Sequence, residues 1–272
     1  MAASEGVDLE WCIVEKIQQK NGLLKKFTRN YSTNILKQTE QCVTSIYKFA
    51  GNSPIEAWHS DDAKNPFHEA IRGEPEPKTD VIFKIAGKVY CASVKMSGPV
   101  QLASGQGSST AKLFQAAAQA LPNKTESKVI SSIIKELETM PTRMLSMSNY
   151  DRIAKEGSAK TIQEFIKNGK IITDKNYEYW VENNKPALMN ALLDYIENDL
   201  DFFAALIEES MTGGETLKKY PGAVADSIIS PKGFHEIDLG YVYKIMPRIK
   251  LDIRGKSRSG ITGIAFRIDY TP

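Results

Sequence analysis

The sequence lacks a long apolar segment, since no run approaches the roughly 20 residues that a helix needs to cross a bilayer. Its first residues include Glu5, Asp8 and Glu10, so they do not have the basic and then apolar layout of a secretion signal. We therefore expect a cytoplasmic protein that has no membrane partner.

Cysteine is scarce, and the spacings typical of several functional classes are missing. Cys12, Cys42 and Cys91 lie far apart in apolar segments without CxxC spacing, which favours buried free thiols over metal ligands or disulfides. The three histidines do not form an HExxH motif, so neither a zinc site nor a catalytic triad is indicated. The glycines at 105 and 107 lack the GxxxxGK[ST] spacing of an ATP-binding loop.

Neither charge sign is in large excess, because 35 Lys and Arg residues against 33 Asp and Glu residues give a formal net charge of +2. Net charge alone therefore does not indicate a nucleic-acid partner. Positive charge is concentrated locally, with five basic residues and one acid between 248 and 258. Such a segment can contact DNA phosphates or can protect the edge of a strand. The candidate DNA-binding residues are Lys250, Arg254, Lys256 and Arg258.

Composition and hydrophobic periodicity predict an α+β protein with one core. The chain is 42% hydrophobic and 25% charged, as in ordinary globular proteins, and its 272 residues can form a single domain over 1–272. Apolar spacing of three and four predicts two or three helices between Val7 and Ala50. A mostly helical pattern over 124–210 predicts a helical insertion within this domain.

The clearest strand signal is a β-hairpin. The segments 79–85 and 88–95 are rich in residues that favour strands, and Ala86-Gly87 between them is a short turn containing glycine. Later strand patterns occur at 223–229, 245–253 and 261–269. We expect these strands to share one sheet with the hairpin.

Three polar residues of this hairpin form the candidate chemical site. Asp80 opens the first strand, and Ser93 and Lys95 lie near the end of the second. Because Ser93 and Lys95 are two residues apart, their side chains point to the same face of the sheet. A carboxylate beside a lysine can hold a hard divalent cation while the lysine orients an attacking water or stabilises a developing charge. Phosphodiester hydrolysis requires these groups.

Pro77-Lys78-Thr79-Asp80, followed by Ser93-Val94-Lys95, resembles the PD-(D/E)XK nuclease superfamily. The resemblance implies a restriction-endonuclease-like fold, in which helices flank a mixed β-sheet core. It also implies a DNA endonuclease that depends on Mg²⁺, with Mn²⁺ as an alternative. Asp80 would bind the metal and Lys95 would assist the water. Ser93 stands where the family has an acid, so another carboxylate would have to complete the metal site.

The sequence offers several acids for that role, of which Glu209 ranks first and Glu40 second, and each is equally readable as a solvated helix charge. The run from Ser97 to Gly105 also resembles phage-encoded and restriction-like nucleases, and on that resemblance Gln101 is a candidate active-site residue. A phage-encoded member would work in the cytoplasm of the host cell.

Two other readings stay open. The chain can be a catalytically inactive nuclease-fold protein that binds nucleic acid or serves in a phage particle, as the serine at 93 suggests. It can also be an interaction domain in which Asp80 and Lys95 form only a cross-strand ion pair. Because restriction-like enzymes that cut both strands often dimerise, the resemblance further suggests a homodimer.

Overall fold

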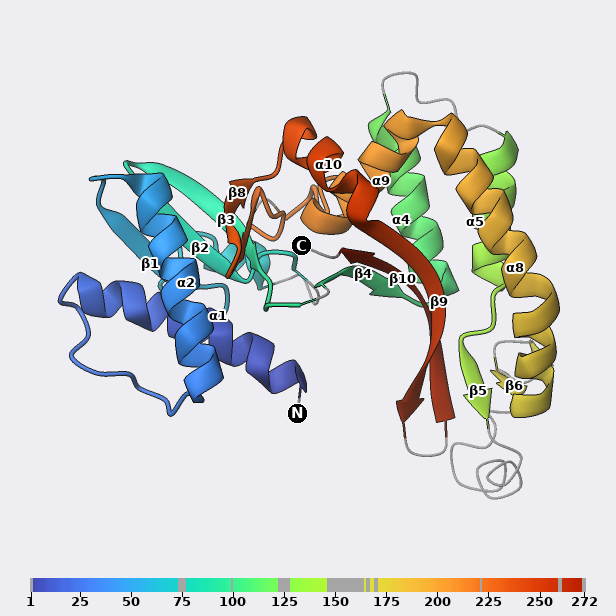
Figure 1. The fold of residues 1–272 in the computed structure, drawn as a ribbon, viewed down its shortest axis with the longest axis horizontal. Helices are drawn as coiled ribbons and strands as arrows, with labels where there is room; N and C mark the ends of the chain where they lie inside the picture. Colours follow the sequence, from blue (N-terminus) through green and yellow to red (C-terminus); the bar gives the residue numbers. More distant parts are fainter. Residues whose placement is uncertain are drawn as a thin grey trace. The chain divides into compact units, whose positions relative to one another are not determined.

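The computed structural model describes residues 2–72, 77–98, 100–121, 128–145, 164, 167–168, 171–220, 222–258 and 261–270. The chain divides into two compact units. The first comprises residues 1–100, 207–248 and 270–272, and the second comprises 101–206 and 249–269. Both helices and strands are present, so the expected α+β class is confirmed (Figure 1). Within the described ranges, no helix is both long enough and apolar enough to cross a membrane.

The first unit contains a five-stranded sheet with the strand order β1-β2-β3-β7-β8. The β3–β7 pair is parallel, whereas β1–β2, β2–β3 and β7–β8 are antiparallel. The elements of this unit are α1 (Ala2–Lys20), α2 (Thr33–Ala50), β1 (Ile55–His59), α3 (His68–Ile71), β2 (Val81–Ile85), β3 (Lys88–Val94), β7 (Ser227–Ser230), β8 (Gly233–Glu236), α10 (Leu239–Ile245) and η1 (Met246–Arg248).

The predicted hairpin is confirmed as β2 and β3. Ala86 and Gly87 both have positive φ values, 51° and 85°, as the two central residues of a type I′ turn require. This turn pairs Ile85 with Lys88 and Val81 with Ala92. The register is thereby fixed up to the end of the hairpin at which the candidate site lies.

The two faces of this sheet pack against different partners. Val81 and Phe83 belong to a large core shared with α1 and α2, which lie against the strands (Figure 1). Ile82 and Cys91 face the other way and form a smaller cluster with Ile71 of α3. The alternation follows from the two-residue period of a strand. Cys12, Cys42 and Cys91 are free and buried, as the sequence predicts.

The second unit has its own sheet, in which β4, β10, β5 and β6 are neighbours and β9 pairs with β10. Phe114, Phe202 and Phe266 pack together in its core. Some residues of β4, α9 and β10 are assigned to the first unit. The elements of the second unit are β4 (Val100–Gly105), α4 (Gly107–Ala120), α5 (Lys128–Thr139), β5 (Arg143–Leu145), β6 (Ile171–Thr173), α8 (Asp174–Asn198), α9 (Leu200–Thr212), β9 (Ile249–Arg258) and β10 (Ile261–Tyr270).

Several sequence-based boundaries differ from the structure. Of the three later strand patterns, only the one at 223–229 contributes to the sheet of the hairpin, through β7, whereas β9 and β10 belong to the second sheet. Ile245 ends α10 instead of starting a strand. β1 (Ile55–His59) lies outside the strand patterns that the sequence shows. The second unit is larger than an insertion over 124–210, because it also includes α4 and the β9–β10 hairpin.

Candidate functional site

The hairpin brings Asp80 and Ser93 into direct contact. Oδ2 of Asp80 accepts a hydrogen bond of 3.1 Å from the hydroxyl of Ser93 and one of 2.7 Å from the backbone N–H of Val94. Among the described residues, no donor contributes a hydrogen bond to Oδ1. The described residues therefore fix the carboxylate through Oδ2.

Strand alternation explains why these groups meet. Val81 points toward α1 and α2, so Asp80, one residue earlier, points to the opposite face. On β3, Cys91 points to that same opposite face, as Ser93 does two residues later. Local sequence period and register therefore suffice to assemble the pair.

Burial dominates the electrostatics of Asp80. It raises the pKa of this carboxyl to about 6, because the ionised form loses hydration. The positive charge of Lys95 opposes the rise in pKa, the negative charge of Glu10 adds to it, and the hydrogen bonds from Val94 and Ser93 lower it. A carboxyl whose pKa is perturbed by burial and by specific charges is typical of functional sites.

Lys95 follows β3 and is half-buried. Its backbone N–H donates a hydrogen bond of 2.8 Å to the carbonyl of Ile229, which holds the start of this segment against β7. In the part of the chain that the structure describes, its ammonium forms neither an ion pair within 4 Å nor a hydrogen bond. Its positive charge nevertheless acts on Asp80 and lowers the pKa of that carboxyl.

Glu10 is a second acid whose negative charge acts on Asp80, and the sequence did not reveal it. It lies on α1, and its Oε2 is 3.1 Å from Nε2 of His59 at the end of β1. Nδ1 of His59 accepts a hydrogen bond of 3.0 Å from the N–H of Asp61, so Nε2 carries the proton and donates it to Glu10. His59 is also stacked on Trp11, with ring centroids 4.2 Å apart. The Glu10 side chain is thus held by a buried, oriented imidazole.

Glu209, the acid that ranked first for the metal site, is used in a different way. Its side chain is buried, and Oε2 accepts a hydrogen bond from the N–H of Glu215. Oε1 accepts hydrogen bonds from both the N–H and the hydroxyl of Thr216. Three donors therefore engage both oxygens, and the carboxylate anchors the loop that follows α9.

Two further candidates, Glu40 and Gln101, form no hydrogen bond or ion pair with Asp80 among the described residues. Glu40 forms an ion pair with Lys16, and about half of its side chain is exposed (54%). Gln101 is exposed on β4, in the second unit, so its assignment to the active site stays a prediction.

The basic segment of β9 is partly neutralised. The guanidinium of Arg254 lies 2.8 Å from a carboxylate oxygen of Asp252 and 3.7 Å from one of Asp269. Lys250 is exposed. The side chains of Lys256 and Arg258 lie outside the described residues. A phosphate that binds Arg254 would therefore compete with these two carboxylates, and the assignment of Arg254 to DNA binding stays a prediction.

The oxygen donors near Asp80 fit a magnesium site that has few protein ligands. Mg²⁺ binds oxygen and often uses only one or two carboxylates, with water and substrate phosphates as its remaining ligands. The carboxylates of Asp80 and Glu10 and the hydroxyl of Ser93 are such donors, and Oδ1 of Asp80 accepts no hydrogen bond from a described residue. No group of three or more His, Cys, Asp or Glu side chains suited to a metal occurs in the described ranges.

Comparisons with known proteins yielded no match to this chain, whether with protein-family models, with curated proteins or with solved structures.

Proposed function

We propose that this protein is a metal-dependent DNA endonuclease whose active site is built on the β2–β3 hairpin. The observation that carries the proposal is the half-buried Asp80, held through Oδ2 by Ser93 and Val94, on which the positive charge of Lys95 acts. A cross-strand ion pair alone would need neither the free oxygen nor the raised pKa. The resemblance of the hairpin motif to PD-(D/E)XK nucleases agrees with this reading.

Each residue of the site has a distinct role in the proposed reaction. Asp80 and Glu10 would hold the metal ion, and Ser93 would keep the Asp80 carboxylate in its orientation. Lys95 would donate hydrogen bonds to the attacking water or to a phosphate oxygen, where its charge stabilises the transition state. Glu10 depends on His59, which fixes its carboxylate. When bound, Mg²⁺ would supply Lewis-acid stabilisation of the charge that develops on the phosphate.

A second candidate function is a nucleic-acid-binding protein of the same fold without catalysis. Ser93 in the position of the family acid favours it, because the acid that normally binds the metal is missing from β3. By the resemblance, we also expect two copies to act together when both strands are cut, and we expect the protein to work in the cytoplasm.

The test of the proposal is cleavage of supercoiled plasmid by the full chain with Mg²⁺ or Mn²⁺, compared with the variants Asp80→Asn and Lys95→Ala. Matched controls are Asp226→Asn, which alters another carboxylate that accepts a β3 backbone N–H, and Lys88→Ala, at the opposite end of β3. We expect both site variants to lose on the order of 10²-fold or more in rate, and both controls to retain it.

Equal cleavage by all variants would point to a contaminating nuclease and would contradict the proposal. Binding of DNA without metal-dependent cleavage by the native chain would favour the second candidate function.

A further inference from the structure

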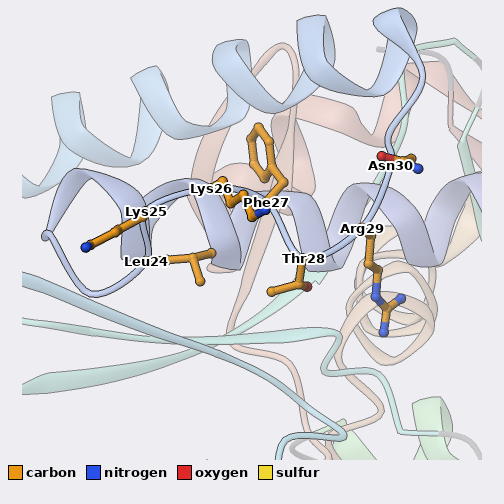
Figure 2. Close-up of a pocket in the computed structure, with 7 residues that line it drawn as sticks. All are labelled: Leu24, Lys25, Lys26, Phe27, Thr28, Arg29 and Asn30. Atoms are coloured by element: carbon orange, nitrogen blue, oxygen red, sulfur yellow. The ribbon is translucent and has the colours of Figure 1, made fainter.

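The loop between α1 and α2 carries positive charge that no acid of the loop balances. Residues 21–32 include Lys25, Lys26 and Arg29 and contain no Asp or Glu. All three cationic side chains are exposed, and within the described ranges none of them lies within ion-pair distance of a carboxylate. The seven consecutive residues Leu24 to Asn30 line a pocket of about 540 Å³. Figure 2 shows Phe27 and Arg29 projecting to opposite sides of this loop.

This cationic loop is held in one conformation by contacts to its neighbours. The buried Glu15 of α1 accepts a hydrogen bond of 3.1 Å from the N–H of Thr28 and another from its hydroxyl. The side-chain amide of Asn21 donates to the carbonyl of Ile55 at 2.6 Å, which ties the start of the loop to β1. Because the backbone is already ordered, a ligand that binds the loop does not have to order it.

A chain of ring contacts connects the loop to the candidate site. The guanidinium of Arg29 lies over the ring of Trp11, 4.5 Å from its centroid. Trp11 is stacked on His59, and His59 donates a hydrogen bond to Glu10. Arg29 is therefore three contacts from a carboxylate whose charge acts on Asp80.

We propose that the loop 24–30 binds backbone phosphates of duplex DNA on the approach to the active site. The inference rests on the proposed function, because that function makes DNA the ligand. Lys25 and Lys26 would contribute charge without reading bases, since phosphate contacts position a duplex but carry no sequence information. Arg29, whose planar guanidinium can contact a phosphate through two donors, would hold the strand nearest to Glu10.

The test measures how the affinity for a short labelled duplex depends on salt, by fluorescence anisotropy in EDTA so that the DNA stays intact. Each phosphate neutralised by a lysine contributes about 0.9 to the slope of log K against log salt concentration. We expect Lys25→Gln and Lys26→Gln each to reduce the magnitude of the slope by about 1, and the double variant to reduce it by about 2. The matched control is Lys48→Gln, an exposed lysine at the far end of α2.

The outcomes separate this inference from the proposed function. If the salt dependence of the double variant has the same slope as that of the native chain, the inference is overturned, even if the protein cleaves DNA. A reduced slope in a protein that never cleaves DNA supports the inference and contradicts the nuclease. An equal reduction by Lys48→Gln would make the effect one of general charge and would overturn the loop as a site. No binding of the native chain at low salt overturns both.

Discussion

The hydroxyl of Ser93 donates a hydrogen bond of 3.1 Å to Oδ2 of Asp80 across the β2–β3 hairpin. Ser93 is only 3% exposed, so a carboxylate at this position would lose most of its hydration. Instead of a second carboxylate, position 93 carries a neutral hydroxyl that donates to the Asp80 carboxylate and orients it. In the proposed site, Glu10 of α1 would take the place of the acid that the hairpin motif lacks.

Activity should depend on the ionisation of Asp80. Burial raises the pKa of this group to about 6 in the metal-free protein, and a protonated carboxyl does not ligate a cation. We expect the affinity for Mg²⁺ to fall by up to about tenfold for each pH unit below 6 and to level off above it. Initial cleavage rates at limiting Mg²⁺ between roughly pH 5 and pH 8 measure this. A rate that stays constant across pH 6 would contradict the role of Asp80.

Replacing Asp80 by asparagine should stabilise the metal-free protein at high pH. Because the pKa of Asp80 is raised on folding, its stabilising contribution is fully present below about pH 4 and is lost as the pH rises through 6. Asparagine resembles the protonated form at every pH. We expect Asp80→Asn to have a higher Tm than the native chain at pH 8 and a similar Tm near pH 4. If the variant were less stable than the native chain at both pH values, the ionised Asp80 carboxylate would not destabilise the folded protein.

Glu10 and Glu40 offer a direct comparison between two acids of neighbouring helices. Glu10 acts on Asp80 and is held by His59, whereas Glu40 pairs with Lys16 at the surface. We expect Glu10→Gln to weaken metal binding by about 10- to 100-fold and Glu40→Gln to leave it unchanged. Metal titrations of cleavage rate measure both. The reverse order of effects would restore Glu40 as the metal ligand.

Glu209 should prove important for stability. Removing its charge weakens three hydrogen bonds to the buried carboxylate, so Glu209→Gln should lower the free energy of unfolding by about 1–3 kcal/mol. Urea denaturation measures the loss. The metal affinity of the folded variant should match that of the native chain. A large loss of metal affinity with unchanged stability would instead place Glu209 in the metal site.

The hairpin and its polar residues were predictable because their signals are local. Strand-forming residues flank Ala86-Gly87, and the two-residue period alone places Ser93 and Lys95 on one face. The type I′ turn then fixes the register that sets Asp80 beside Ser93. No contact from a distant segment is needed to derive this part of the site.

The role of Glu10 was not predictable, because it depends on how α1 packs on the sheet. Glu10 is 70 residues before Asp80, and no spacing rule links them. Glu209 shows the converse difficulty, since an acid just before Gly213 suits a metal site and a loop anchor equally well in sequence. The hydrogen bonds from Thr216 show that Glu209 anchors the loop, and the Glu209→Gln variant tests the metal site. Likewise, strand patterns identified β9 and β10 but did not reveal the sheet to which they belong.

Binding of Mn²⁺ to the metal-free protein, followed by electron paramagnetic resonance, tests most directly whether Asp80 holds a divalent cation. We expect the native chain and Asp226→Asn to bind Mn²⁺ at pH 8, and Asp80→Asn to bind it at least about tenfold more weakly. Equal Mn²⁺ affinity in all three proteins, or no binding by the native chain with duplex DNA present, would contradict a metal-dependent site on the β2–β3 hairpin.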